Sequence, residues 1–220
     1  VIKMHKAIMT QTPLPKEEIE LFKQLKDLKI IFDVGTRTDT DYIELRPESE
    51  HHLFEPNPEF FDELWAKVKD KGSNVHANKY GLGEKGQVVA YIEGFQTFVD
   101  SSAINNPYAT GNLLLPMKTL DTYLLETGIK QIDFLKMDTE GYELKILLGA
   151  TNWFHIIKFI QYEHWGKHNN QMIKGLLGED FDCFDVGYRN VLCMNKQLVS
   201  EEERVRLRTY IENNKLGELM

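Results

Sequence analysis

Short runs of apolar residues alternate along the chain with longer segments in which apolar positions recur every three or four residues. Compact apolar runs are typical of buried strands, whereas apolar positions spaced in this way form one side of an amphipathic helix. The strands expected on this basis cover residues 29–34, 52–54, 75–77, 132–137 and 156–162. A turn near the middle of 181–194 predicts a hairpin, and residues 87–92 are expected to be extended.

Five amphipathic helices are expected between and around these strands. They cover residues 16–28, 58–71, 119–126, 143–148 and 200–213. Asn57 is a favourable N-cap, and Pro58 suits the first position of the second helix. Gly128 and Gly149 are placed to end the third and fourth helices. The side chains of the second helix expected to face the core are Phe61, Leu64, Trp65 and Val68. Residues 100–115 have no helical period and predict a long loop.

This alternation of strands and helices predicts a single α/β domain with a mostly parallel sheet and helices on both faces. The terminal hairpin adds an antiparallel edge, as mixed sheets often have. We expect an N-terminal helical cap over residues 1–28, a main domain over 29–198, and a C-terminal helix over 199–220 that packs on the same domain. Ligands of such folds bind beyond the carboxyl ends of the strands, so the residues just after each strand are the candidates for chemistry.

The charge balance limits the choice of partners. Of the 220 residues, 34 are acidic and 26 are basic, which gives a formal net charge of −8. A nucleic-acid-binding protein needs a basic surface, and an anionic membrane surface would repel this chain, so neither partner is expected. No run of about 18 apolar residues predicts insertion into a membrane, and the first residues lack the apolar core of a signal peptide.

Cys183 and Cys193 are the only cysteines in the sequence. Two cysteines are too few for a disulfide framework or a cysteine-based zinc site. We therefore expect both to be reduced, small and apolar, as in proteins of the reducing cytoplasm. The sequence thus predicts a cytoplasmic protein.

The first two strands end in residues that suit a nucleoside ligand. Asp33 and Gly35 end the first strand, and Glu55 follows Asp33 by 22 residues, directly after the second strand. Glycine allows a tight turn and a close approach of the backbone to a ligand. An acidic side chain at this distance can accept hydrogen bonds from both ribose hydroxyls. The alternative is a simple turn, followed by an acidic residue that the positive end of the next helix favours.

Two later strands end in groups suited to proton transfer. Asp138 and Glu140 follow the strand 132–137, where they can orient a substrate hydroxyl, take its proton or bind a divalent ion. The alternative is a helix start with acidic residues in its first turn. His164 follows the fifth strand, and its ordinary pKa suits a general base. The alternative for His164 is a structural or exposed histidine.

Three ordered blocks of the sequence carry a family resemblance. They are FDVGTRTD at 32–39, LFEPNP at 53–58 and LKMDTEGYELKILLGA at 135–150. Together they resemble the FkbM family of S-adenosylmethionine-dependent methyltransferases. The resemblance runs from about residue 29 to about 195 and includes Ser101 and Ser102. The family is similar to class I methyltransferases, which implies a Rossmann-like, seven-stranded sheet with its last strand antiparallel.

The resemblance implies a site for S-adenosylmethionine. Its cofactor-binding residues would be Asp33, Gly35, Thr36, Arg37, Glu55, Gly81, Leu82 and Asp138. Within this set, Glu55 would hold the ribose, and Gly81 and Leu82 would lie at the adenine. Asp138 and Glu140 would face the reacting centre, and His164 or Asp138 is our candidate for the base. The family's usual reaction implies O-methylation of a hydroxyl on a sugar, a glycan or another small molecule.

The first block departs from the family pattern. Thr36-Arg37-Thr38-Asp39 stands where the family usually has Ala-Asn-X-Gly, so the second glycine is missing. A side chain at Asp39 narrows the approach of the backbone to the cofactor, whereas Arg37 could pair with the cofactor's carboxylate. An alternative function is therefore a degenerate methyltransferase-like module that recognises a glycan or a protein partner.

Two further alternatives concern other cofactors. A nicotinamide-dependent oxidoreductase needs a Gly-x-Gly-x-x-Gly turn, and only Gly35 is present there. Mg²⁺ is compatible with the oxygen donors Asp138, Glu140 and Glu163, but their spacing does not demand a metal. Choice of acceptor is expected to depend on residues 100–115 and on the polar segment 165–180.

Overall fold

A seven-stranded sheet lies at the centre of the computed structural model, which describes residues 14–86, 89–92, 97–99, 112–164 and 166–219. The strand order is β11-β12-β10-β9-β1-β2-β3. The strands are β1 (Ile30–Val34), β2 (Glu50–Phe54), β3 (Val75–Asn78), β9 (Ile132–Met137), β10 (Ile157–Glu163), β11 (Phe181–Gly187) and β12 (Asn190–Asn195). β12 runs antiparallel to both β10 and β11, and the other neighbouring strands of this sheet are parallel, so the mixed α/β sheet with an antiparallel terminal hairpin is confirmed.

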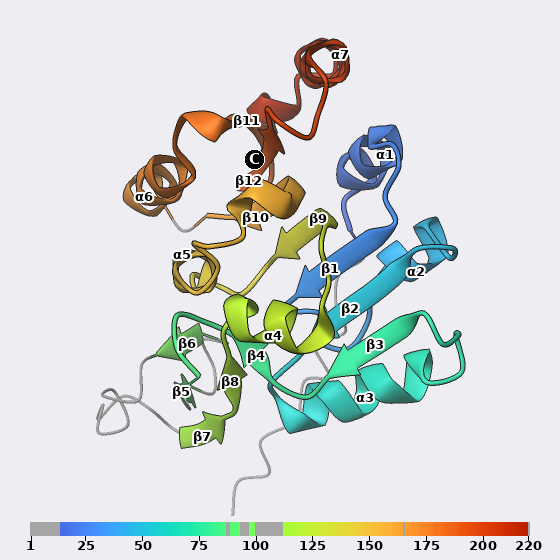
Figure 1. Cartoon of the computed structure of the whole chain (residues 1–220), viewed down its shortest axis with the longest axis vertical. Coiled ribbons are helices and arrows are strands. Elements are labelled where there is room, and N and C mark those ends of the chain that lie inside the picture. Colours follow the sequence, from blue (N-terminus) through green and yellow to red (C-terminus); the bar gives the residue numbers. More distant parts are fainter. Residues whose placement is uncertain (1–13, 87–88, 93–96, 100–111, 165, 220) are drawn as a thin grey trace, which may run out of the picture.

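Helices cover both faces of this sheet (Figure 1). They are α1 (Lys16–Gln24), α2 (Tyr42–Leu45), α3 (Pro58–Val68), α4 (Leu120–Thr127), α5 (Glu143–Leu148), α6 (Lys167–Leu177) and α7 (Glu201–Asn213). Helices α4, α5 and α6 share one apolar core with the sheet. Helices α1, α2 and α7 share a second core on the other face, and α3 packs on a smaller one near β2 and β3. The division of the chain at residues 28 and 198 stays a prediction.

Short elements complete the described chain. Single 3₁₀ turns are η2 (Phe154–Ile156), η3 (Gly178–Asp180) and η4 (Leu216–Glu218). Two small sheets consist of β4 (Gly81–Leu82) with β8 (Met117–Lys118), and of β5 (Val89–Ile92) between β6 (Thr97–Val99) and β7 (Asn112–Leu115). The extended segment expected at 87–92 therefore contains β5.

Capping residues explain where several helices begin and end. The side chain of Asn57 accepts hydrogen bonds from the backbone amides of Glu59 and Phe60, as expected for the N-cap of α3. Thr119 and Ser200 cap α4 and α7 in the same way. Gly128 ends α4 in the left-handed conformation, with φ of +71°, which glycine adopts without strain.

Some expected elements differ in the structure. Helix α1 ends at Gln24 instead of residue 28, because the chain becomes extended at Leu25 while the apolar spacing continues. Helix α6 was not expected, because its only buried residues are Ile173 and Leu177. Strand β7 occupies the end of the expected loop 100–115, and the rest of that loop, with Ser101 and Ser102, lies outside the described residues.

The inward placement of Trp65 was wrong. Leu64 and Val68 are buried, but Trp65 is 46% exposed. The buried stripe of α3 is narrow, and Trp65 lies beside it with its ring stacked on Phe61.

The expectation of reduced cysteines was also wrong. Cys183 in β11 and Cys193 in β12 are direct cross-strand partners, with Cα atoms 4.0 Å apart, and they form a disulfide. Antiparallel pairing explains the contact, because the register of the hairpin, with a bulge between Asp185 and Gly187, places Cys183 directly opposite Cys193. The prediction of a cytoplasmic protein was based on reduced cysteines, and the disulfide removes that argument. No helix in the described part of the chain is long and apolar enough to cross a bilayer.

Reducing the disulfide is expected to destabilise the hairpin edge of the sheet. A cross-link that closes a loop of this size contributes about 2–3 kcal/mol, which for a chain of this length corresponds to a fall in Tm of about 5–10 °C. Thermal unfolding with and without a reductant measures this shift. Cys183→Ala is the control, since its Tm should not respond to the reductant. Two titratable thiols in the untreated, denatured protein would contradict the disulfide.

Candidate active site

The carboxyl ends of four neighbouring parallel strands carry acidic side chains. Asp33 lies in β1, Glu55 follows β2, Asp138 follows β9, and Glu163 ends β10. The strand order places these ends side by side, because β10, β9, β1 and β2 are consecutive in the sheet. The tertiary structure thus gathers residues that are far apart in the sequence.

Gly35 forms the turn that follows β1. Its φ is +87°, and a Cβ atom there would lie 2.0 Å from the backbone oxygen of Asp138. The Gly35 amide donates a hydrogen bond to the carbonyl of Phe54. Glycine is therefore required for the close packing of this turn against β2 and the end of β9, whatever ligand binds there.

Glu55 is buried and bound by two backbone amides. Its carboxylate oxygens accept hydrogen bonds from the amides of Arg37 at 2.8 Å and Asn57 at 2.7 Å. Burial raises the pKa of Glu55 to about 7, although these two hydrogen bonds act in the opposite direction. The turn after β1 and the start of α3 are thus joined through one carboxylate.

The side chains of the altered turn after Gly35 contact α3 and the backbone of β1. Thr36 donates its hydroxyl hydrogen to the carbonyl of Asp33 at 2.8 Å. Arg37 has a left-handed backbone, and its guanidinium lies 5.2 Å from the ring centre of Phe60. Asp39 forms an ion pair with Lys67 at 2.8 Å. The Asp39 side chain, which is 55% exposed, therefore faces the outer side of α3.

A small apolar cavity lies beside Gly35. Its walls include Phe54, Pro56, Leu82, Met117 and Tyr142, and its volume is about 10 Å³. Gly81 also lines it, and a Cβ atom at Gly81 would lie 2.8 Å from the sulfur of Met117. Such a cavity has room for about one water molecule.

Lys136 is a buried cation within the acidic group. Its Nζ donates to Oδ1 of Asn190 at 2.8 Å and lies 3.5 Å from Glu18 of α1 and 3.8 Å from Asp138. Burial acts against the charge of Lys136, but the surrounding carboxylates, with Glu18 the strongest, raise its pKa. The sequence analysis missed this residue, although a lysine within an apolar strand is an unusual signal.

Asp138, Glu140 and Glu163 form a compact group of carboxylates. One oxygen of each lies within 4.8 Å of the others. Burial, followed by the charge of Asp138, raises the pKa of Glu163 to about 7 and also raises the pKa of Glu140. Arg189 offsets part of this repulsion through an ion pair with Glu163 at 2.5 Å. Such a group can accept hydrogen bonds from a hydroxyl or hold a cation.

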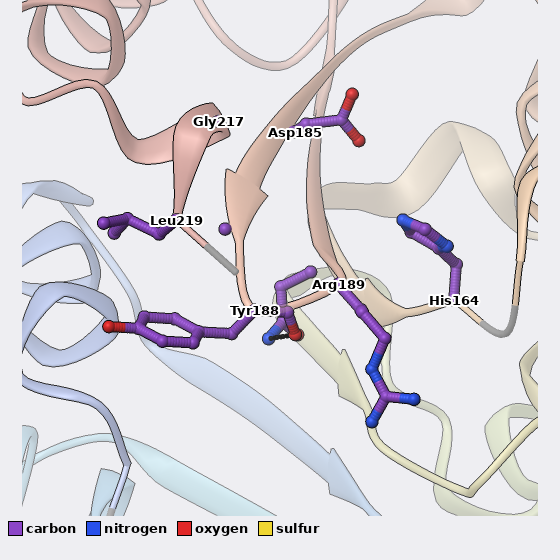
Figure 2. A pocket seen from close by; sticks show the side chains of 8 residues that line it. His164, Asp185, Tyr188, Arg189, Gly217 and Leu219 are labelled. Atoms are coloured by element: carbon purple, nitrogen blue, oxygen red, sulfur yellow. Dashed lines mark hydrogen bonds between the residues drawn. The ribbon is translucent and has the colours of Figure 1, made fainter.

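His164 lines a separate cavity at the β11–β12 turn. Figure 2 shows His164 and Tyr188 on opposite sides of Arg189. The cavity has a volume of about 590 Å³ and also includes Asp185 and Asn190. The His164 amide donates to the carbonyl of Arg189, and its buried Nδ1 has no hydrogen-bond partner within the described residues. Within the described part of the chain, His164 is not among the residues that gather with Asp138, Glu140 and Glu163.

Residues 33–189 match the family model of the methyltransferase FkbM domain. The chain belongs to this family. The hexuronic acid methyltransferase AglP of Haloferax volcanii is 24% identical over 144 residues, which are 65% of this chain and 59% of that protein. The crystal structure of methyltransferase FkbM from Methylobacillus flagellatus KT has a TM-score of 0.54 at 16% identity, over 76% of this chain and 43% of that one. This chain spans less than two thirds of the length of either relative, and the structural likeness shows the same fold.

Membership of the family implies S-adenosylmethionine as the methyl donor. The residue types fit this group, because Glu55 offers a carboxylate to a ribose and Phe54, Pro56 and Leu82 offer an apolar wall. The contact between Glu55 and the Arg37 amide lies where the ribose hydroxyls would compete.

Asp33→Asn is expected to stabilise the protein at high pH. Burial raises the pKa of Asp33 to about 7, so the folded state binds its proton more tightly than the unfolded state. Binding of this proton stabilises the folded state fully at pH values below the pKa that Asp33 has in the unfolded chain. This contribution is lost as the pH rises through about 7, the pKa of Asp33 in the folded protein. Asparagine lacks the charge, so the variant should exceed the parent by roughly 1–4 kcal/mol at pH 8 and match it more closely near pH 5.

Thermal unfolding at pH 5 and pH 8 measures this difference. Asp70→Asn is the control, because Asp70 is exposed and its substitution should leave Tm nearly unchanged at both pH values. An Asp33→Asn variant that is less stable than the parent at pH 8, but not at pH 5, would contradict the raised pKa.

Proposed function

We propose that this protein is an S-adenosylmethionine-dependent O-methyltransferase that acts on a hydroxyl of a sugar or glycan. Two findings support a sugar acceptor. The relative AglP is named for the methylation of a hexuronic acid, and the cavity at the β11–β12 turn is lined by the polar side chains of His164, Asp185 and Arg189 among its apolar walls. The proposed function involves neither a nucleic-acid partner nor insertion into a membrane.

The observation that carries the proposal is the position of His164. Its imidazole lines a cavity of about 590 Å³, and its buried Nδ1 has no partner in the described structure. A buried polar atom of this kind is usually paired. Solvent does not reach Nδ1, so the His164 ring must turn towards the cavity before this nitrogen can bind a ligand group. Asp185 and Asn190 supply further hydrogen-bonding groups, and Tyr188 supplies an aromatic ring (Figure 2).

The residues around the site have distinct roles in the proposed reaction. Glu55 would hold the ribose of the cofactor and the turn from Asp33 to Arg37 its methionine part, and the cofactor would supply an electrophilic methyl group. Asp138, or His164 from the cavity at the β11–β12 turn, would take the hydroxyl proton as the acceptor oxygen bonds to the methyl carbon and the bond from that carbon to sulfur breaks. Glu140 accepts a hydrogen bond from the acceptor and orients it. Positioning of this kind accounts for much of the catalysis of a displacement reaction.

A second candidate function is a binding module that no longer transfers a methyl group. The hydrogen bond from the Arg37 amide to Glu55 favours it, because this bond uses a carboxylate oxygen that the ribose would need. In that case the cavity beside His164 would bind a glycan without turnover. Cofactor binding distinguishes the two candidates.

Calorimetric titration with S-adenosylmethionine and S-adenosylhomocysteine tests the cofactor. We expect micromolar binding that Glu55→Ala weakens at least tenfold, since the ribose loses its acceptor. Glu63→Ala is the matched control, because Glu63 lies on the exposed side of α3 and should leave the affinity unchanged. If the parent protein is folded and binds neither compound, the second candidate replaces the first.

Transfer of a labelled methyl group to a panel of sugars, including hexuronic acids, tests the reaction itself. Asp138→Asn and His164→Gln separate the two candidate bases, and loss of the base should lower kcat by about 10²–10⁴-fold. The other substitution should have a smaller effect on kcat. Full turnover in both variants would rule out both residues as the base.

A further inference from the structure

A group of metal-binding side chains lies at the other end of the β2–β3 pair, away from the site described above. Glu50 and His52 are in β2, and His76 pairs with His52 in the adjacent strand β3. Residues at alternate positions of a strand point to the same face of the sheet, so all three side chains lie on the face that α4 covers (Figure 1). This group includes none of the residues assigned to methyl transfer.

The distances within this group suit a small divalent ion. Nε2 of His52 and Nε2 of His76 lie 3.1 and 3.2 Å from the same oxygen of Glu50. In a tetrahedral Zn²⁺ site, bonds of about 2.0–2.1 Å place neighbouring ligand atoms about 3.3 Å apart. One donor atom from each of the three residues lies within 4.8 Å of the others. His76 is 45% exposed, so its ring has room to turn towards an ion.

A hydrogen bond on the far side of His52 fixes its ring. Nδ1 of His52 lies 2.7 Å from the hydroxyl oxygen of Tyr123 in α4. If the ring proton occupies Nδ1, it is donated to Tyr123 and the lone pair of Nε2 points towards Glu50 and His76. Metal-bound histidines are commonly oriented by such a bond.

From this arrangement we propose that Glu50, His52 and His76 form a Zn²⁺ site that joins the edge strand β3 to β2 and, through Tyr123, to α4. Two imidazoles and one carboxylate are a ligand set that zinc accepts. Glu50 and His76 are 41% and 45% exposed, so solvent can provide the fourth ligand. We assign this ion a structural role. β3 is the edge strand of the seven-stranded sheet and pairs there only with β2, so an ion bound by both strands would fasten the edge to its neighbour. This proposal does not depend on the proposed methyltransferase activity.

Zinc titration of the full chain, after treatment with a chelator, tests the site. Competition with a chromogenic chelator of known affinity gives the stoichiometry and Kd. We expect one Zn²⁺ per chain at micromolar Kd or tighter, and a rise in Tm of about 3 °C or more at saturation. His76→Gln should weaken binding at least tenfold and abolish the rise in Tm.

Two further variants keep the result interpretable. His155→Gln is the matched control, because His155 is exposed and remote from this group in sequence, and it should bind zinc like the parent. Glu50→Gln should reproduce the loss seen in His76→Gln, and an unchanged Tm of each metal-free variant shows that the fold is intact. Zinc binding that persists in both site variants, or no binding by the parent protein at 100 μM Zn²⁺, would overturn the proposal.

Discussion

A single buried cation, Lys136, holds together the acidic end of the central sheet. Its ammonium group contacts Asn190 of β12, Glu18 of α1 and Asp138 after β9. Removal of one partner from a buried ion pair leaves an uncompensated charge, which destabilises a protein far more than loss of an exposed pair. Lys136 thus links α1, β12 and the acidic residue after β9 through one charge, beside the apolar packing of α1 through Leu21 and Phe22.

Raised carboxylate pKa values and residues with positive φ both occur at the candidate site. The pKa values of Asp33, Glu55 and Glu163 are each raised to about 7, chiefly by burial. Of the six non-glycine residues with positive φ in the described chain, Tyr188 and Arg189 form the two-residue β11–β12 turn, in which positive φ is the usual geometry. Arg37 and Glu140 follow strands β1 and β9 at this end of the sheet. Strained backbone of this kind persists where the surrounding structure enforces it and is concentrated at functional sites. Its position agrees with a ligand site at this end of the sheet.

The turn after β1 explains how the chain can differ from its family and retain the same fold. Gly35, which the packing against Asp138 requires, is present, whereas the second glycine of the family pattern is replaced by Asp39. Asp39 points to Lys67 on α3, and the Arg37 amide binds Glu55. The change therefore redirects a side chain towards α3 and leaves intact the close packing of Gly35 on which the fold depends.

The local pattern of the sequence determined most of the elements and the family. Asn57, Thr119 and Gly128 mark helix ends through bonds to their own neighbours, and the strand Ile132–Met137 follows directly from its apolar run. The candidate residues Asp33, Glu55 and Asp138 were recognisable because the family blocks are continuous in sequence. Only the tertiary structure decided the pairing of Cys183 with Cys193, the outward position of Trp65, the contact of Lys136 with Glu18, and the approach of Glu50 and His52 to His76. These features depend on strand register and on helix placement, which arise from burial and pairing across the whole sheet and not from neighbouring residues.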